Sequence, residues 1–450
     1  MKTSLTIILA LSIFTSCTTN QGAEYDLVIT NVNLIDGTGA PIQQGVNVYV
    51  KDRVIVKIDS DQSPVIENTI DGTNKYLIPG LFDCHVHPDS YVDDFPRLMH
   101  YGITSIFIPG GSSCTDEVFT RMRAMGNQDS IPSPRVFHSS HHFTLEGRHP
   151  VKTYASSNWV EGETVFYLRD TAQIAHLVKR VSKQPISGIK LTIEDGPAPP
   201  FVERISQDFI NKTVREASKY GLEVFAHVSD NEELRMAIAG GTQNLVHYTG
   251  VNINPDDTAH LALIQRAKEL DVSWVTTLMI DKSFLYPVNP EWFDEESMIT
   301  AYKEARNEIT EEVRKQSEFY SKLLQEEYGI EGNGLEDFIN PQVKDIQFLM
   351  KEGLNMVLGT DAGNDFNFYG YSLHEEMQLM EMGGIQSIDI IKMGTLNAAI
   401  MMHAQDSLGS IEVGKLADMI LLDANPLVDI GNARAIHTVY KGGKIQKRIN

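Results

Sequence analysis

Two histidines stand two residues apart at the end of an apolar run, in the stretch Leu81-Phe82-Asp83-Cys84-His85-Val86-His87. In an extended strand, residues i and i+2 point to the same face, so both imidazoles would project to one side and Val86 to the other. Imidazole is a preferred ligand of zinc and similar ions. Two partly buried histidines near a loop are the alternative interpretation. Only further ligands elsewhere in the chain can decide between the two.

Four more polar residues occupy positions where such ligands could converge. His227, His247 and Asp361 each directly follow an apolar run. Lys190 lies in the middle of another apolar run, 186–193, although an unpaired ammonium is costly in apolar surroundings. In a (β/α)₈ barrel, residues at the C-terminal ends of the strands meet at one catalytic face. An aspartate after a strand is often only a helix N-cap, but the set as a whole predicts a metal site.

The remaining pattern indicates the elements that would hold these residues. From 77 to 404, short apolar runs alternate with amphipathic stretches, which is typical of repeated βα units. Residues 24–76 and 405–450 are instead rich in β-branched runs and turn signals. We therefore predict an α/β chain with a (β/α)₈ TIM barrel over 77–404 and a small β-sandwich domain formed by both ends of the chain. A highly charged stretch predicts a helical insertion near 281–345.

Length and charge limit the kind of partner. A chain of 450 residues is long enough for one large domain and a smaller one. Its formal net charge is −22, and it has no basic tract, no phosphate-binding glycine loop and no zinc-finger cysteine pairs. Nucleic-acid binders instead show clustered lysine and arginine, so nucleic acid is excluded as a partner. A small-molecule substrate is expected. The sequence is compatible with a homo-oligomer but carries no signal for one.

The N-terminus has the pattern of an export signal. The apolar run 5–14 is too short to cross a bilayer core of about 30 Å as a helix. Together with Cys17 and the polar residues after it, this run resembles a bacterial lipoprotein signal. We predict a signal peptide over 1–17 ending at a lipidated Cys17, and a linker over 18–23. The protein would then be an exported cell-envelope lipoprotein of a Gram-negative bacterium, anchored in the membrane on the periplasmic side or at the cell surface. Secretion with cleavage nearby is the alternative, and the two other cysteines are too few for a disulfide framework.

Several motifs together resemble the amidohydrolase superfamily, and the resemblance covers nearly all of the mature chain. They are the run 76–87, which contains the two spaced histidines, the sequence Gly359-Thr360-Asp361-Ala362-Gly363, and the tail 409–418 followed by Asn425-Pro426-Leu427. The combination is far more specific than a lone His-x-His. Within the superfamily, the chain most resembles the branch that contains imidazolonepropionase and the Xaa-Pro or Xaa-Arg dipeptidases.

The resemblance implies a binuclear metal centre with these protein ligands: His85, His87, Lys190, His227, His247 and Asp361. The first two histidines and the aspartate would bind one divalent ion, and the other two histidines the second. The lysine would react with CO₂ and bridge both ions as a carbamate, which turns an awkward buried cation into an anionic ligand. Zinc is the metal that this histidine-rich set predicts.

This centre predicts hydrolysis of an amide C–N bond. Two divalent ions lower the pKa of a shared water, so that hydroxide is available near neutral pH. Asp361 would take the proton from the attacking water and pass it to the leaving amine. We predict dipeptides or N-acyl amino acids as substrates. Arg148 and His149 would bind their carboxylate, unless these two residues only shape a loop. Related dipeptidases have a tyrosine after strand 4, where the nearest aromatic residue here is Phe201.

Three other functions stay open at this point. One is hydrolysis of a cyclic amide, as in imidazolonepropionase. A second is a mononuclear deaminase, but such sites use a glutamate just after the strand 5 histidine and no bridging lysine. Here Val228-Ser229-Asp230 follows His227. The third is a non-catalytic binding lipoprotein on the same scaffold, which the complete set of ligand positions disfavours.

Overall fold

The computed structural model describes residues 25–61, 68–154, 157–196, 201–248, 250–328 and 334–449. The predicted signal peptide, Cys17 and the predicted linker lie outside these residues. Within them, no helix combines the length and the apolar character that a membrane crossing requires.

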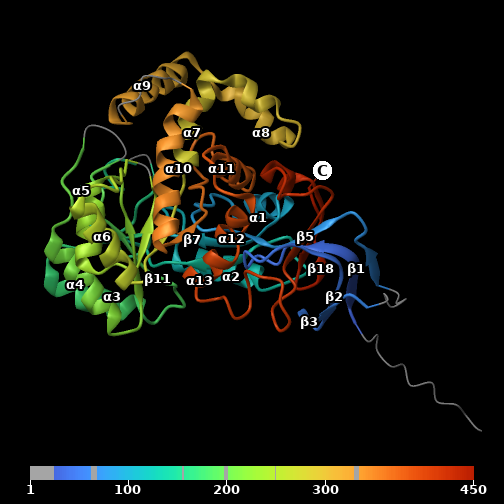
Figure 1. Cartoon of the computed structure of the whole chain (residues 1–450). Helices are drawn as coiled ribbons and strands as arrows, with labels where there is room; N and C mark the ends of the chain where they lie inside the picture. The colour runs from blue at the N-terminus through green and yellow to red at the C-terminus, as the bar shows by residue number, and fades with distance from the viewer. Residues whose placement is uncertain are drawn as a thin grey trace, which may run out of the picture.

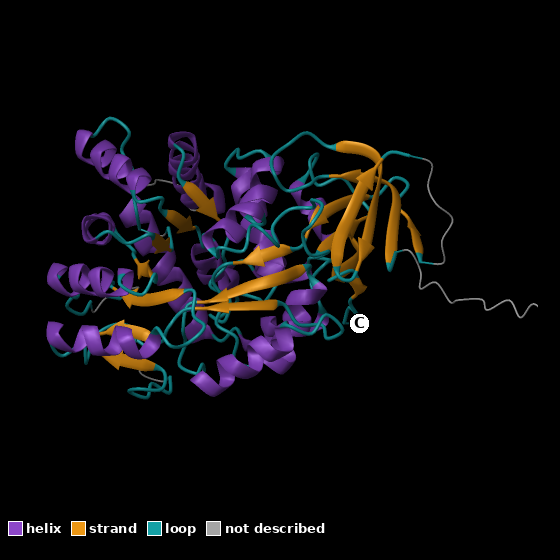
Figure 2. Ribbon diagram, turned by 90° about the horizontal axis from the view of Figure 1, so that it is seen from below, coloured by secondary structure: helices purple, strands orange, loops and turns teal. Residues whose placement is uncertain are grey.

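Both ends of the chain build one mixed β-sheet, which lies to one side of the molecule (Figures 1 and 2). Its strands are β1 (Leu27–Leu34), β2 (Gln43–Lys51), β3 (Val54–Asp59), β4 (Thr69–Asp71), β5 (Tyr76–Pro79), β16 (Met419–Leu422), β17 (Ile436–Lys441) and β18 (Lys444–Ile445). The order is β18-β17-β16-β5-β1-β2-β3, with β4 beside β1. The two ends join where β5 and β16 pair antiparallel, Ile78 opposite Ile420. Alternate residues such as Val46, Val48 and Val50 pack into a separate hydrophobic core, as the period of a strand requires.

The middle of the chain forms a parallel barrel. Among the described residues its eight strands are β6 (Leu81–Asp83), β7 (Ile103–Ile108), β8 (Arg135–His138), β11 (Gly188–Thr192), β12 (Glu223–His227), β13 (Asn244–Val246), β14 (Ser273–Val275) and β15 (Asn355–Val357). Backbone hydrogen bonds close the ring, from Ser140 N–H to Gly188 O at 2.8 Å and from Cys84 N–H to Leu358 O at 3.1 Å. Two short strands, β9 (His142–Thr144) and β10 (Val165–Tyr167), extend the sheet beside β11. The predicted barrel with a second β unit built from both chain ends is confirmed.

Helices cover the outside of the barrel: α1 (Tyr91–His100), α2 (Asp116–Gly126), α3 (Thr171–Val181), α4 (Gln207–Ser218), α5 (Asn231–Gly240), α6 (Thr258–Glu269), α10 (Leu335–Glu352), α11 (Tyr371–Met382), α12 (Ser387–Met393) and α13 (Leu396–Met401). Aspartate side chains cap several of them. Asp230, for example, accepts a hydrogen bond from the backbone of Glu233 at 2.8 Å. This strand-end aspartate therefore begins α5, three residues after His227.

A helical arm leaves the barrel in the long connection that follows β14. It contains α7 (Met279–Leu285), α8 (Thr300–Glu304) and α9 (Glu311–Tyr328), separated by the short 3₁₀ segments Tyr286–Val288, Pro290–Asp294 and Ala305–Glu308. In Figure 1, α8 and α9 lie at the top of the molecule, away from the sheet formed by the chain ends. The arm begins at Met279 and leads into α10, so it overlaps the region 281–345, where charge patterning predicts a helical insertion.

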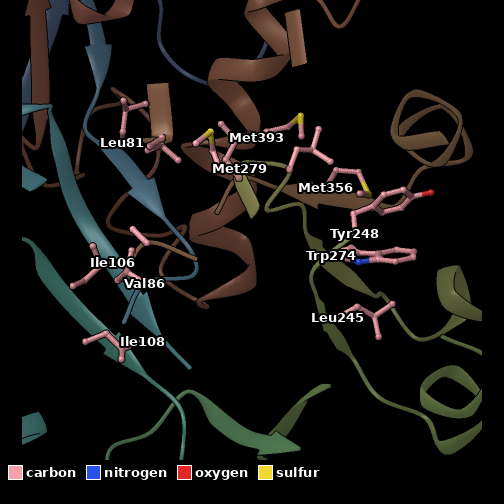
Figure 3. Close-up of a cluster of buried hydrophobic side chains, with 14 of the residues drawn as sticks. Leu81, Val86, Ile106, Ile108, Leu245, Tyr248, Trp274, Met279, Met356 and Met393 are labelled. Atoms are coloured by element: carbon pink, nitrogen blue, oxygen red, sulfur yellow. The ribbon is translucent and has the colours of Figure 1, made fainter. Parts of the chain in front are cut away.

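Apolar residues between strands and helices form the main core (Figure 3). Tyr248 and Trp274, whose ring centroids are 4.9 Å apart, pack there beside Met356. A separate cluster that includes Phe107 and Phe225 contains residues of successive barrel strands. A Cβ at Gly188 would come within 2.6 Å of the Phe225 ring, so only glycine leaves room for that ring beside β11.

A buried ion pair joins the sheet to the barrel. Arg135 at the start of β8 donates from Nε and Nη2 to both carboxylate oxygens of Asp418, at 2.6 and 2.8 Å. Such bidentate arginine–carboxylate pairs fix the geometry as well as contribute energy. Lys441 adds a hydrogen bond from Nζ to the carbonyl of Ser133 at 2.5 Å. These contacts hold the second β unit against the barrel next to β8.

Candidate metal centre

The strand-end residues singled out in the sequence converge on one cavity of about 170 Å³. Its polar lining includes His85, His87, His142, His149, Lys190, His227, His247 and Asp361. Tyr154 and Trp159 add aromatic surface from the segment that follows β9. All six predicted metal ligands therefore face the same cavity.

The first ligand group surrounds the carboxylate of Asp361. The Nε2 atoms of His85 and His87 are 3.2 Å apart, and they lie 3.3 and 3.1 Å from Asp361 Oδ1. This is the common face that the i, i+2 spacing predicts, whereas Val86 packs into the core. His247 also offers a ring nitrogen within 4.8 Å of a ring nitrogen of His85 and a carboxylate oxygen of Asp361. Atoms that could each donate a lone pair thus point at one another, as they do around a shared cation.

The second ligand group contains two residues that were absent from the predicted metal ligands, Glu194 and His149. His149, Glu194 and His227 bring one ligand atom each within 4.8 Å of the others. His227 Nε2 contacts Glu194 Oε2, and His149 Nε2 lies 3.3 Å from the same oxygen. The rings of His227 and His247 have centroids 4.1 Å apart, so the two groups adjoin.

Hydrogen bonds on the far side of the ring orient two of the imidazoles, those of His87 and His247. His87 donates from Nδ1 to the carbonyl of Gly110 at 2.9 Å, which leaves Nε2 with its lone pair. His247 Nδ1 lies 3.0 Å from Thr277 Oγ1, and its Nε2 has no hydrogen-bond partner. Metal-binding histidines are usually fixed in this way, with one ring nitrogen held and the other free for the ion.

The carboxylate of Asp83 joins the first and last barrel strands beneath the ligands. It accepts hydrogen bonds from the backbone of His85 at 3.2 Å and from the backbone and hydroxyl of Thr360 at 3.0 and 2.6 Å. Burial raises the pKa of Asp83 to about 7, although these donors oppose the shift. Asp83 thereby fixes the two strands from which His85 and Asp361 project.

Two ligands adopt a backbone conformation that side chains usually avoid. His247 has φ of 74° and Asp361 has φ of 62°, in the left-handed region. For residues other than glycine this costs on the order of 1–3 kcal/mol each and is concentrated at functional sites. Nearby, a Cβ at Gly359 would come within 2.4 Å of Val275 and 3.1 Å of His85. Glycine there makes room for the His85 side chain.

Burial sets the charge state of the ligands. It lowers the pKa of His247 to about 3, and it lowers the pKa of His85 and His227 well below the usual value, so these rings stay neutral as metal ligands must. Burial also lowers the pKa of Lys190 to about 8, against the attraction of Asp361 and Glu194. Only a neutral amine can add CO₂, and a lowered pKa makes that form more abundant near neutral pH.

The unpaired atoms of the site fit a cation. Among the buried side-chain atoms of the described residues that have no hydrogen-bond partner are these site atoms: Lys190 Nζ, Glu194 Oε2, His247 Nε2 and Asp361 Oδ1. Leaving a buried polar group unsatisfied costs about 1–3 kcal/mol. Imidazole and carboxylate donors are the set that zinc and related divalent ions prefer. Metal ions would bind the ring nitrogen of His247 and the carboxylate oxygens of Glu194 and Asp361, whereas the Lys190 amine would become a ligand only as a carbamate.

The two predicted substrate contacts are separated in the structure. His149 lines the cavity and faces Glu194. Arg148 pairs instead with Glu203, an exposed residue, and is not among the described residues that line the cavity. Phe201, the aromatic residue nearest to the position where related dipeptidases have a tyrosine, is 57% exposed. A carboxylate contact from Arg148 stays a prediction without geometric support here.

Sequence reasoning missed Glu194, His142, Tyr154 and Trp159 as parts of the site. Glu194 had the signal that identified the others, since it follows the end of a buried strand. Its setting in Thr192-Ile193-Glu194-Asp195-Gly196 instead suggests an acidic turn. The two aromatic residues lie in an irregular segment whose local pattern carries no comparable signal.

Comparison with known proteins identifies the class. The amidohydrolase family matches residues 76–446, so the chain belongs to this family. It is a metal-dependent amidohydrolase, an enzyme that acts on carbon–nitrogen bonds. The predicted superfamily and enzyme class are therefore confirmed.

Individual relatives are distant but cover most of the chain. Ochratoxinase from Aspergillus niger is 24% identical over 466 residues, covering 92% of this chain and 85% of that protein. A 5'-deoxyadenosine deaminase from Methanothermobacter thermautotrophicus is 21% identical over 437 residues, covering 92% and 88%. The crystal structure of a Xaa-Pro dipeptidase with bound methionine superimposes with a TM-score of 0.68 at 21% identity, covering 94% of this chain and 99% of that one. At such identities, structural likeness supports the fold alone.

The site predicts a measurable metal content. We expect roughly two divalent ions per chain, with zinc preferred by the histidine-rich donors. Lys190→Ala should lower that content and abolish hydrolysis, and a short carboxylic acid added to the variant should partly restore it by replacing the carbamate. Metal analysis by mass spectrometry measures the content, with the exposed Lys179→Ala as a control. Full metal loading and normal turnover in Lys190→Ala would contradict the bridging role.

Proposed function

We propose that this protein is a binuclear zinc hydrolase that cleaves an amide bond in dipeptides or N-acyl amino acids. The observation that carries the proposal is the convergence of six predicted ligands on one cavity, with unpaired ligand atoms facing one another. Lys190, whose Nζ has no hydrogen-bond partner, would act as a carbamate ligand after reaction with CO₂. This modification turns the buried cation into the anion that two adjoining cations require.

Divalent ions bound here would lower the pKa of water and polarise the scissile carbonyl. The protein contributes the proton transfer through Asp361. Its Oδ2 accepts a hydrogen bond from Asn364 at 3.0 Å, while Oδ1 faces the histidine pair. Burial pushes the pKa of Asp361 up, but His87, His247 and Lys190 bring it below its usual value, so the carboxylate is ionised and able to accept a proton. Asp361 would then deliver that proton to the leaving amine.

The cavity suits a small substrate with a carboxylate beside the scissile amide. Two divalent ions would carry four positive charges, and Asp361, Glu194 and a carbamate would carry three negative ones, so the centre would keep a net positive charge toward an anionic substrate. Tyr154 and Trp159 offer apolar surface for a side chain. Hydrolysis of a cyclic amide, as in imidazolonepropionase, uses the same centre and is the second candidate. A mononuclear deaminase is disfavoured because Lys190 lines the cavity and Asp230 caps α5.

The exported location rests on the N-terminal pattern alone. We propose that Cys17 is lipidated and that the enzyme is held at the cell envelope. Bacterial lipoproteins resemble the case in which several acyl chains hold a protein firmly, whereas a single chain anchors it only marginally. Wild-type protein should then sediment with membranes, and Cys17→Ser should be released or wrongly processed. Wild-type protein found entirely in the soluble periplasm or the medium would contradict lipidation and support simple secretion.

Asp361→Asn keeps the shape of the side chain but removes the basic oxygen. We expect turnover to fall by at least ~10²-fold, the lower range for a general acid–base residue. Asp230→Asn is the matched control, because this strand-end aspartate caps a helix and asparagine caps equally well. Zinc content measured in parallel separates proton transfer from metal loss. Nearly unchanged turnover in Asp361→Asn would assign the proton transfer elsewhere.

The carboxylate preference can be tested with pairs of substrates that differ in one group. N-acyl amino acids and dipeptides should be hydrolysed more efficiently than the same compounds with an amidated C-terminus. An interaction with a charged group contributes about 1.5–3 kcal/mol, which corresponds to roughly ten- to hundredfold in kcat/KM. Steady-state kinetics at fixed pH measure this ratio. Equal rates for acid and amide would favour a neutral or cyclic amide.

A further inference from the structure

Glu194 extends the inward-facing side of β11. Along a strand, alternate residues share a face. Lys190 lines the cavity, and Thr192 hydrogen-bonds from this face to His142, with Oγ1 2.9 Å from Nδ1. Ile193 packs into the hydrophobic core on the other side, and Glu194, 3% exposed, follows the same alternation. The chain therefore directs a second acid toward the cations, four residues after the predicted carbamate.

Other buried glutamates of the described barrel have the donors that a structural carboxylate needs. Glu233 accepts hydrogen bonds from the backbone of Ser229 at 2.7 Å and from Arg204 Nε at 2.8 Å. Glu376 accepts from the Thr276 hydroxyl at 2.5 Å and from the backbone of Met279 at 2.8 Å. Glu194 Oε2 has no hydrogen-bond partner and faces two imidazoles instead. Glu194 is thus not placed as a structural acid.

The tautomer of His149 strengthens the contrast. Thr153 Oγ1 lies 2.6 Å from His149 Nδ1 and 3.2 Å from the carbonyl of Pro150, and we assign the hydroxyl proton to that carbonyl, so that the oxygen accepts from Nδ1–H of His149. His149 Nε2 is then left with a lone pair, directed at Glu194 Oε2, 3.3 Å away. Two acceptors this close, in a buried place, require a proton or a cation between them. His227 offers a third ligand atom, a ring nitrogen, close to the same two atoms.

We propose that Glu194 and His149, together with His227, bind the second ion of the centre. His247 would then belong to the first ion, because its ligand atom lies with those of His85 and Asp361. The second ion would have two imidazoles, one carboxylate and the bridging carbamate, which are the nitrogen and oxygen donors that zinc prefers. The assignment rests on the proposed binuclear centre and adds two ligands to it. It also gives His149 a role in metal binding in place of the carboxylate contact predicted from sequence.

Zinc titration tests this assignment without any substrate. Metal-free protein is titrated with Zn²⁺ against a competing chelator, for the wild type, Glu194→Gln, His149→Ala and the control Asp195→Asn. Asp195 is the adjacent acid, but it pairs with Arg204 at 2.9 Å. Loss of even an outer partner of a metal ligand typically costs 10–100-fold in affinity. We therefore expect one of the two ions to bind at least ~10-fold more weakly in Glu194→Gln and in His149→Ala, and normally in the control.

Cobalt spectra and thermal unfolding supply independent readouts. The visible absorption of Co²⁺-loaded protein should change in Glu194→Gln, because one oxygen donor is lost. Without metal, Glu194→Gln should unfold at the same temperature as the wild type or at a higher one, because the buried carboxylate is removed. Its stabilisation by zinc should be smaller. A carboxylate with a merely structural role would instead lower the unfolding temperature of the metal-free variant.

Two unchanged zinc affinities and an unchanged cobalt spectrum in Glu194→Gln would overturn the proposal. If that variant does not fold, the same result in His149→Ala would overturn it, because a substrate contact leaves metal binding intact. A protein that binds zinc through Glu194 but hydrolyses no amide would contradict the proposed function alone. Amide hydrolysis with zinc binding that is independent of Glu194 would contradict this assignment alone.

Discussion

The contact between Asp83 and Thr360 is the constraint on which the site depends. A barrel can hold ligands from its first and last strands together only if those strands are fixed to each other at the right height. Asp83 does this with one buried carboxylate and three donors, which offset only part of the cost of its burial, since its pKa stays raised. His85 lies two residues beyond it and Asp361 directly follows Thr360. A small shift of this contact would therefore move ligands of the first ion relative to one another.

The centre works against the stability of the metal-free fold. Unpaired lone pairs are buried side by side, and two ligands hold left-handed backbone conformations. These features lower the free energy of unfolding relative to a conventionally packed core. A bound metal ion would offset this cost, because it would bind the unpaired ligand atoms. The surrounding barrel tolerates them because neighbouring strands fix each ligand through the backbone. We therefore expect metal occupancy and resistance to unfolding to be coupled in this protein.

The sequence predicted the fold, and the six residues predicted as ligands line one cavity, because both follow from local patterns. Apolar runs gave the strands, and polar residues at their ends identified His227, His247 and Asp361, while Lys190 was conspicuous as a charge within an apolar run. Glu194 was missed because acidic residues before a glycine also form turns. The preference of Arg148 for Glu203 could not be predicted, since these residues are distant in sequence and come together only through loop geometry. Long-range pairing of exposed charges has no local signature.

The pairing of β5 with β16 has a consequence for the order in which the chain can fold. Ile78 lies opposite Ile420, so the central pair of the sheet needs both ends of the polypeptide. Contacts between such distant segments form slowly, because the loop entropy must be lost before the contact contributes any stability. During synthesis, β1 to β5 emerge long before β16 and expose the edge of β5 with which β16 later pairs. The emerging chain must keep that edge from pairing with other strands until its last residues arrive.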